Sequence, residues 1–287
     1  MKVLVTGCTG YVGSHLCKKL KEHGHEVHGF DVNFHGEHND VSFIDKFWIQ
    51  DLNDRYLHGW GDAVVHLAGR SVVPQSLKEP SNYYRVNTMG TKNAVEKLRT
   101  DNFIFASTSS AFEMRSPYAR SKVGAEDIIK EKADGYTIFR FFNVSGTDGI
   151  HRQLGTPSHL IRMAAMAAAG NIPDIKVFGN DYDTRDGTCI RDYIHVCDIS
   201  DAIIRAVEKG PANTDYECLG SNTGYSVFDV LKTMENVSNT NIKKILAPRR
   251  EGDAHSCIVE NLSEFCDLKY TLEDMCYDQY KMQLNLN

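Results

Sequence analysis

The sequence predicts an α/β protein with a doubly wound parallel sheet, followed by a smaller C-terminal domain. Two observations indicate this fold: short apolar runs alternate with longer segments of helical period, and a glycine-rich turn follows the first run. The 287 residues, 41% hydrophobic and 24% charged, have the composition of an ordinary folded chain. We expect residues 1–142 to form the sheet domain and residues 143–287 to form the second domain, partly interleaved with the first.

The elements of the first domain follow from this alternation. Because β-branched and apolar runs of four to six residues are separated by helical segments, the strands should be parallel and joined by crossover helices. The expected strands are Lys2–Val5, Glu26–Phe30, Ala63–Leu67, Phe103–Ser107 and Tyr136–Phe141, and the expected helices are Tyr11–Glu22, Tyr84–Leu98 and Tyr118–Lys132. Beyond Asn143 we expect a glycine-containing loop, a helix at Leu160–Ala169, a strand at Lys176–Phe178 and mixed elements after Arg191.

Charge and hydropathy exclude two classes of partner. With 32 basic and 38 acidic residues the net charge is −6, so the surface has no general attraction for nucleic acid. No apolar run approaches the roughly 20 residues that a membrane span needs. The chain opens on MKVLVTG, which enters a strand-like run without a leader, and we expect a cytoplasmic protein.

The cysteines and histidines give no indication of a metal site. None of the eight cysteines forms a CxxC pair, so we expect neither a disulfide framework nor a zinc centre. Five histidines crowd one region without carboxylates at a fixed spacing, and we expect them to face solvent and to bind no metal. They are His23, His25, His28, His35 and His38.

A glycine motif predicts a dinucleotide site. The segment Gly7-Cys8-Thr9-Gly10-Tyr11-Val12-Gly13 follows the first strand and opens the first helix. Glycines let the backbone turn sharply and approach a pyrophosphate, whose charge is stabilised by the helix N-terminus. Asp31 ends the second strand, where a carboxylate accepts from ribose hydroxyls and repels a 2′-phosphate. The pattern favours a Rossmann domain that binds NAD rather than NADP.

A second motif predicts a proton-transfer site. Tyr118 and Lys122 stand four residues apart on one face of a helix, where the ammonium can stabilise a phenolate. Tyr277 and Lys281 repeat the spacing, but they follow no core strand and are interpreted as a surface pair. Before Tyr118, by contrast, a strand ends in the hydroxyl run Ser107–Ser110, at the sheet edge where ligands bind.

With these motifs in place, the chain resembles the extended short-chain dehydrogenase/reductases and, among them, the UDP-glucose 4-epimerase family. The most specific match is residues 178–196, which resemble the family segment FGxDYxTxDGTxxRDYIHV. Shorter matches extend the resemblance over almost the whole chain. They are Val65–Gly69, Asn87 before Gly90-Thr91, Arg140–Asn143 and Arg249–Asp253.

The resemblance implies a role for each matching residue. Tyr118 corresponds to the catalytic base, Lys122 to its partner, and Thr108 to the hydroxyl that bonds the sugar O4. The implied cofactor contacts are Gly7, Gly10, Tyr11, Val12, Gly13, Asp31, Asp51, Leu52, Leu67, Ala68, Gly69, Asn87, Tyr118 and Lys122. The implied substrate contacts are Thr108, Asn143, Phe178, Arg191, Tyr193, Arg250, Asp253 and Cys257. For the arginines the physical reason is that a guanidinium pairs two phosphate oxygens at once.

The sequence also departs from the family pattern. The loops after Asp31, Phe112 and Asn143 are shorter, which predicts a more open sugar pocket. Ser71 replaces the usual lysine near the cofactor, and His159 an asparagine near the diphosphate. Related 4,6-dehydratases carry Asp-Glu where this chain has Ser109-Ser110, so the acid and base for elimination are missing. Cys257, being small, leaves room for an N-acetyl group.

The function that the sequence predicts is NAD-dependent 4-epimerisation of a UDP-hexose through a 4-keto intermediate. Two alternatives remain open: an NAD-dependent epimerase of another nucleotide-sugar, such as a uronic acid, and a nucleotide-sugar-binding protein without turnover. The intact Thr108, Tyr118 and Lys122 favour an enzyme. The family resemblance further implies a homodimer.

Overall fold

The computed structural model describes residues 1–32, 39–250 and 254–286. Its centre is a seven-stranded sheet in the order β12-β8-β7-β5-β1-β2-β3, and every neighbouring pair in it is parallel. The strands are β1 (Lys2–Thr6), β2 (Glu26–Asp31), β3 (Lys46–Ile49), β5 (Ala63–His66), β7 (Phe103–Thr108), β8 (Tyr136–Phe141) and β12 (Glu217–Leu219). The doubly wound parallel sheet is thereby confirmed.

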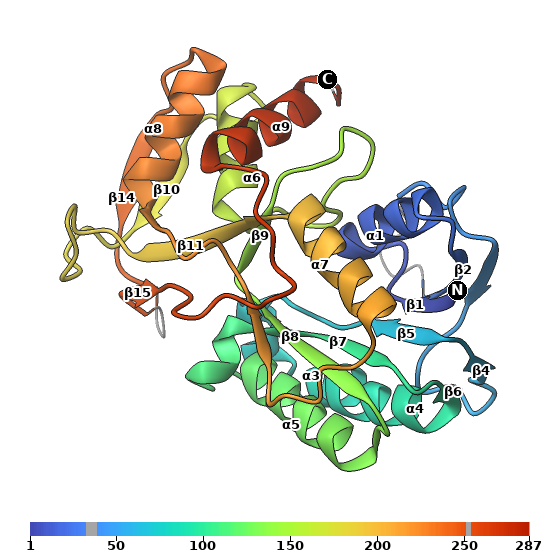
Figure 1. Cartoon of the computed structure of the whole chain (residues 1–287). Coiled ribbons are helices and arrows are strands. Elements are labelled where there is room, and N and C mark those ends of the chain that lie inside the picture. Colours follow the sequence, from blue (N-terminus) through green and yellow to red (C-terminus); the bar gives the residue numbers. More distant parts are fainter. Residues whose placement is uncertain (33–38, 251–253, 287) are drawn as a thin grey trace.

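Helices cover both faces of this sheet (Figure 1). One face carries α1 (Tyr11–Glu22) and α7 (Val196–Lys209), whose side chains share one core with β1 and β5. On the other face lie α4 (Gly90–Lys97) and α5 (Pro117–Lys132), and between β5 and α4 run α2 (Val73–Lys78), α3 (Pro80–Tyr83) and the π-helical η1 (Tyr84–Met89). The helix expected at Tyr84–Leu98 is therefore two differently wound segments, and Leu98 lies in a short strand.

Short elements complete this part of the chain. They are the strand pair β4 (Gly59–Trp60) and β6 (Leu98–Arg99), and the 3₁₀ turn η2 (Ser109–Phe112). The turn begins where β7 ends, because the Thr108 hydroxyl accepts from Ser110 N at 3.2 Å and so caps its first residues. The hydroxyl run predicted from the sequence therefore leaves the sheet at its carboxyl edge.

The C-terminal part packs three helices around its own core (Figure 1). These are α6 (Leu160–Ala168), α8 (Val227–Ser238) and α9 (Leu272–Leu284), which bury Ile161, Leu231 and Met275 among them. Small sheets flank the helices, formed by β10 (Ile175–Phe178) with β14 (Lys244–Ala247), and by β9 (Asn143–Ser145), β11 (Ile190–His195), β13 (Gly224–Ser226) and β15 (Ser256–Cys257). The helix and the strand expected near 160 and 176 are confirmed.

The two parts of the chain interleave. After β11 the chain returns to the large sheet, where α7 packs on α1 and β12 pairs with β8. Tyr11 of α1 donates from its hydroxyl to the Gly146 carbonyl at 2.6 Å, and Gln279 of α9 donates to the same oxygen at 2.7 Å. A single carbonyl after β9 therefore links the first helix with the last one.

Candidate active site

The glycine turn after β1 has no room for a side chain at Gly7 or Gly13. Gly7 adopts φ +73°, and a Cβ there would lie 2.7 Å from the Ala68 nitrogen. A Cβ on Gly13 would lie 2.1 Å from the Gly7 carbonyl oxygen, which fixes how closely α1 approaches the turn. Gly10 is the N-cap of α1. The backbone is therefore open toward a ligand at the positive end of this helix, as a pyrophosphate requires.

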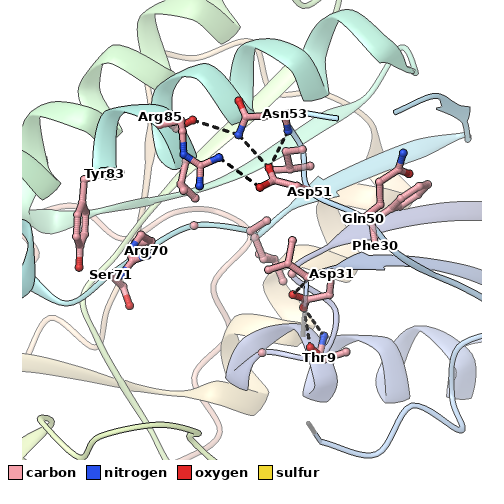
Figure 2. Close-up of a pocket in the computed structure, with 18 of the residues that line it drawn as sticks. Thr9, Phe30, Asp31, Gln50, Asp51, Asn53, Arg70, Ser71, Tyr83 and Arg85 are labelled. Atoms are coloured by element: carbon pink, nitrogen blue, oxygen red, sulfur yellow. Dashed lines mark hydrogen bonds and ion pairs between the residues drawn. The ribbon is translucent and has the colours of Figure 1, made fainter. Parts of the chain in front are cut away.

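A cavity of about 380 Å³ lies in front of this turn (Figure 2). Eight of the predicted cofactor residues line it: Gly7, Gly10, Asp31, Asp51, Leu52, Leu67, Ala68 and Gly69. The structure thus gathers residues from the ends of β1, β2 and β5 and from the loop after β3. Tyr11, Val12, Gly13, Asn87, Tyr118 and Lys122 do not belong to this lining.

Two carboxylates stand in the cavity wall (Figure 2). Asp31 accepts from the Thr9 amide at 2.9 Å and the Thr9 hydroxyl at 2.8 Å, which hold it at the end of β2. Asp51 accepts from Asn53 N at 2.8 Å and from Arg85 at 3.3 Å. Burial opposes ionisation of Asp51, but these hydrogen bonds outweigh burial and its pKa is lowered.

These residues fit the parts of NAD. The glycines leave the backbone approach that a pyrophosphate needs. Asp31 Oδ2 already accepts both Thr9 hydrogen bonds, whereas Oδ1 accepts from the Val32 amide at 2.7 Å and retains a lone pair for a ribose hydroxyl. Phe30 and Leu52 add apolar surface to the lining, suited to an adenine ring.

Asn87 joins the cavity to α5, the helix that carries Tyr118. Its side chain is buried and bonds the backbone of Arg70 in both directions, at 2.8 Å and 3.0 Å. It also donates to the Ser121 hydroxyl of α5 at 2.9 Å. The structure therefore holds Asn87 as a clamp between the loop after β5 and the helix that carries Tyr118.

Thr108 and Tyr118 adjoin where β7 ends, and Lys122 follows Tyr118 by one turn of α5. The Thr108 side chain, at the end of β7, hydrogen-bonds the Tyr118 hydroxyl, and the Tyr118 ring makes an edge contact with Tyr83, centroids 6.4 Å apart. Tyr83 lines the cavity, and a Cβ on Gly69 would lie 3.8 Å from the Lys122 Nζ. The proton-transfer group thus borders the cofactor cavity.

The electrostatics of this group differ from the expectation. Burial raises the pKa of Tyr118, and the Thr108 hydrogen bond only partly offsets this. Burial lowers the pKa of Lys122 to about 7, opposed by Glu126. Its ammonium lies 4.0 Å from the centre of the Phe105 ring. The Tyr118–Lys122 spacing predicts that Lys122 lowers the Tyr118 pKa. This prediction is wrong, because desolvation dominates and the Tyr118 pKa is raised.

The expected substrate residues come from several elements of the C-terminal part. Asn143 donates to the Asp192 carbonyl at 2.8 Å. Arg191 of β11 lies opposite Cys257 in the parallel register of β11 with β15. Arg250 stacks its guanidinium 3.9 Å from the centre of the Phe178 ring. The structure also places Tyr193 in the buried core, where its pKa is raised by desolvation. Asp253 lies outside the described residues.

Sequence reasoning missed several residues of the cavity. Arg70, beside the Ser71 that replaces the family lysine, lines it and stands 5.5 Å above the Tyr83 ring. Arg85 reaches the cavity from η1 and pairs with Asp51. Only the position of Arg70 directly after Gly69 could have indicated its place, whereas nothing in the local pattern pointed to Arg85.

The histidine prediction needs correction. His25 and His28 are buried, because His25 lies 3.3 Å from Glu208 of α7 and the His28 ring packs against Trp48 of β3, while His23 is exposed as expected. His35 and His38 lie outside the described residues. A separate buried group, in which His151 lies 2.8 Å from Asp148 and His15 lies 3.5 Å from it, was not predicted. All eight cysteines are free.

Comparisons with known proteins agree with this site. Residues 3–218 match the NAD dependent epimerase/dehydratase family. UDP-glucose 4-epimerases from Bacillus subtilis and Homo sapiens are each 31% identical; the alignments cover 99% and 98% of this chain, and 97% and 96% of the relatives. The Bacillus alignment runs over 328 positions against 287 residues here, so the relative has additional residues, in keeping with shortened loops.

Solved structures show the same fold. A UDP-glucose 4-epimerase from Stenotrophomonas maltophila, with bound NAD and formylated UDP-arabinopyranose, superposes with a TM-score of 0.86 at 28% identity, covering 100% of this chain and 98% of that one. The enzyme from Bifidobacterium longum, in complex with NAD+ and UDP, gives 0.87 at 25% identity, covering 99% and 98%. None of the described helices is long and apolar enough to cross a membrane. Taken with the glycine turn and its cavity, these matches establish that the chain belongs to the NAD dependent epimerase/dehydratase family and is an NAD-dependent epimerase.

Proposed function

We propose that the protein inverts C4 of a UDP-hexose, interconverting UDP-galactose and UDP-glucose, with Tyr118 as the base. The observation that carries this is the Thr108–Tyr118 hydrogen bond beside the cavity that fits NAD. The curated relatives that this chain matches along nearly their whole length are UDP-glucose 4-epimerases, which favours a hexose over the uronic acid alternative. Thr108 adjoins Tyr118, and Lys122 follows one turn later on the same helix, which favours turnover over simple binding.

Tyr118 has the proton-transfer role in this proposal. Its oxygen takes the proton of the sugar 4-hydroxyl, directly or through Thr108, and later returns a proton to the same oxygen. Bound NAD supplies reversible acceptance of the C4 hydride. Lys122 contributes positive charge, which favours the phenolate form of Tyr118 once the site is filled. In the structure burial outweighs the other effects, and the raised pKa of Tyr118 keeps the phenol protonated at neutral pH.

The substrate is held by its nucleotide half. Inversion requires the 4-keto sugar to turn over while the UDP stays in place, so the diphosphate needs firm contacts and the hexose few. We assign the firm contacts to Arg191 and Arg250, and by the family resemblance we add Asn143, Phe178, Tyr193 and Asp253 to the proposed substrate contacts. A guanidinium offers several donors in a fixed plane, which suits phosphate oxygens.

We further propose that UDP-N-acetylhexosamines are substrates. Cys257 lies on β15 opposite Arg191 and hydrogen-bonds Ser109, so it borders the proposed sugar position. Its small side chain leaves space there. A Campylobacter jejuni relative, 31% identical, is a UDP-Glc/GlcNAc 4-epimerase. Turnover of UDP-hexoses with no measurable turnover of the N-acetyl forms contradicts this part of the proposal.

We also propose which part of the chain binds each ligand, and that the protein forms a homodimer. Residues 1–142 hold NAD, and residues 143–287 hold the nucleotide-sugar while contributing α7 and β12 to the sheet domain. Exposed apolar side chains on α2 and η1, namely Val73, Leu77, Tyr84 and Met89, support a homodimer that pairs these helices beside α5. The net charge of −6 supports a small-molecule substrate rather than a nucleic-acid partner.

The decisive experiment is incubation of the purified protein, supplied with NAD, with UDP-galactose. We expect UDP-glucose to form until both sugars reach equilibrium, without net change in NADH absorbance. Parallel incubations with UDP-glucuronic acid and UDP-N-acetylglucosamine identify the substrate class. Tight binding of these sugars with no product from any of them contradicts the enzyme and leaves the binding protein.

A further inference from the structure

A buried carboxylate stands on α5 behind the proton-transfer group. Glu126 follows Lys122 by one helical turn and Tyr118 by two, so the three side chains lie along one face of the helix. Glu126 is 2% exposed. It accepts from the Ser107 hydroxyl, and from Arg140 at 3.0 Å and 2.7 Å in a two-pronged contact. It is the most strongly bonded group of α5 that the proposed mechanism does not use.

These contacts bind three elements together at the active site. Ser107 immediately precedes Thr108 at the end of β7, and Arg140 lies near the end of β8. The Arg140 guanidinium packs against the rings of Phe112, 4.7 Å away, and Tyr216, 3.9 Å away. Ser107 precedes Thr108 in the chain, and Phe112 belongs to the turn that follows it. The network therefore fixes the backbone on both sides of Thr108.

The second neighbour of Glu126 is Lys122. The charged and titratable groups that act on Lys122 are Glu126, one turn further along its own helix, and His66 on β5. His66 is buried between Thr6 and Thr91, and burial lowers its pKa to about 3, so it is neutral near pH 7. Glu126 is therefore the negative charge that favours the protonated form of Lys122, against the burial that opposes it.

We propose that Glu126 is a positioning residue for the proton-transfer group. It fixes the end of β7 that carries Thr108 through Ser107, and its negative charge favours the protonated form of Lys122 one turn before it on α5. Arg140 prevents the buried carboxylate from being left without a cation. This inference rests on the proposed function, because it assigns Lys122 a charge that the epimerase reaction uses.

The test compares Glu126→Gln with Asp127→Asn. Asp127 is the next residue on α5 and is exposed, so its variant removes an equal charge without touching the network. The Lys122 pKa is measured by NMR of isotope-labelled lysine side chains, assigned with Lys122→Met, and the pH profile of turnover is recorded in parallel. We expect Glu126→Gln to lower the Lys122 pKa and to move the alkaline limb of kcat to lower pH, with about tenfold loss above that limb for each pKa unit.

A second variant separates this role from simple folding. Glu126→Gln alone leaves Arg140 buried without its counterion and can unfold the protein. Glu126→Gln/Arg140→Met removes both charges and leaves an apolar side chain at position 140 against the rings of Phe112 and Tyr216. We expect the double variant to fold, with the alkaline limb still displaced and with kcat approaching wild type at pH 6. Asp127→Asn should behave as wild type.

Two outcomes overturn the inference. One is an unchanged Lys122 pKa in the double variant. The other is full recovery of turnover and of the alkaline limb in that variant, which assigns Glu126 to stability alone. The NMR measurement needs no substrate, so it tests the charge on Lys122 even in a protein that fails to epimerise UDP-hexoses. Failure of the proposed function and failure of this inference are therefore distinguishable.

Discussion

Tyr118 is the residue whose loss affects the proposed chemistry most directly. Its hydroxyl is bonded to Thr108 and its ring contacts Tyr83, so Tyr118→Phe removes one oxygen and preserves the packing. We expect kcat to fall by roughly 10² to 10⁴-fold, which is the typical contribution of positioned proton transfer. NAD binding, followed by fluorescence titration, should change little. Near-normal turnover in this variant removes Tyr118 from the reaction.

Gly7 offers a test of the close approach at the glycine turn. Gly7→Ala combines a strained φ of +73° with a Cβ only 2.7 Å from a backbone nitrogen. Gly24 has a similar φ of +79° but nothing within 4 Å, so Gly24→Ala is the matched control that carries only the conformational cost. We expect the control to lose about 1 kcal/mol of unfolding free energy and Gly7→Ala at least about 2 kcal/mol, with weaker NAD binding. Urea unfolding measures the difference, and equal losses contradict the steric argument.

Residue roles were predictable where a backbone requirement marks the sequence. Gly7 and Gly13 are such positions, because any side chain would collide with backbone atoms. Asp31 was predictable from its place at a strand end. Arg85 was not, because its contact with Asp51 joins residues 34 positions apart and depends on how η1 packs. The direction of the Tyr118 pKa change was also inaccessible, since it depends on burial in three dimensions.

At the scale of the element, α7 closes one face of the sheet. Ile203 of α7 is 1% exposed and shares its core with Leu16 and Leu20 of α1. We expect Ile203→Ala to lower the free energy of unfolding by about 2–5 kcal/mol, the range for a large-to-small change in a packed core. Lys209→Ala, on the exposed last turn of the same helix, should stay within about 0.5 kcal/mol. Chemical denaturation compares the two, and a small loss at Ile203 places α7 outside the sheet core.

Elements were predictable in proportion to how much of their pattern is local. The strands β1, β2, β5, β7 and β8 are apolar runs and were expected within a residue or two. The edge strands β3 and β12 were not. β3 is a run of only four residues whose apolar members, Phe47, Trp48 and Ile49, are all exposed, and β12 has three residues that join the sheet across a long separation from β8. Edge pairing of this kind is fixed by tertiary contact and leaves little local signal.

The whole molecule should lose stability on mild acidification. Burial lowers the pKa of His15 from 6.5 to about 4 and that of His66 to about 3. Between pH 6.5 and pH 4 the unfolded chain therefore binds protons that the folded protein does not, and stability rises with pH over this window. Each histidine contributes a slope of at most about 1.4 kcal/mol per pH unit. Urea unfolding between pH 4 and 7 measures it, and a flat profile contradicts neutral burial of both rings.

The return of α7 and β12 to the first sheet has a consequence for how such a chain can be altered. A fragment that stopped at residue 142 would expose the apolar faces of Leu16 and Leu20 and leave β8 as an open edge, inviting aggregation. Residues 143–287 are therefore not a unit that recombination can exchange at that junction, because α7 and β12 would have to leave the first sheet with them.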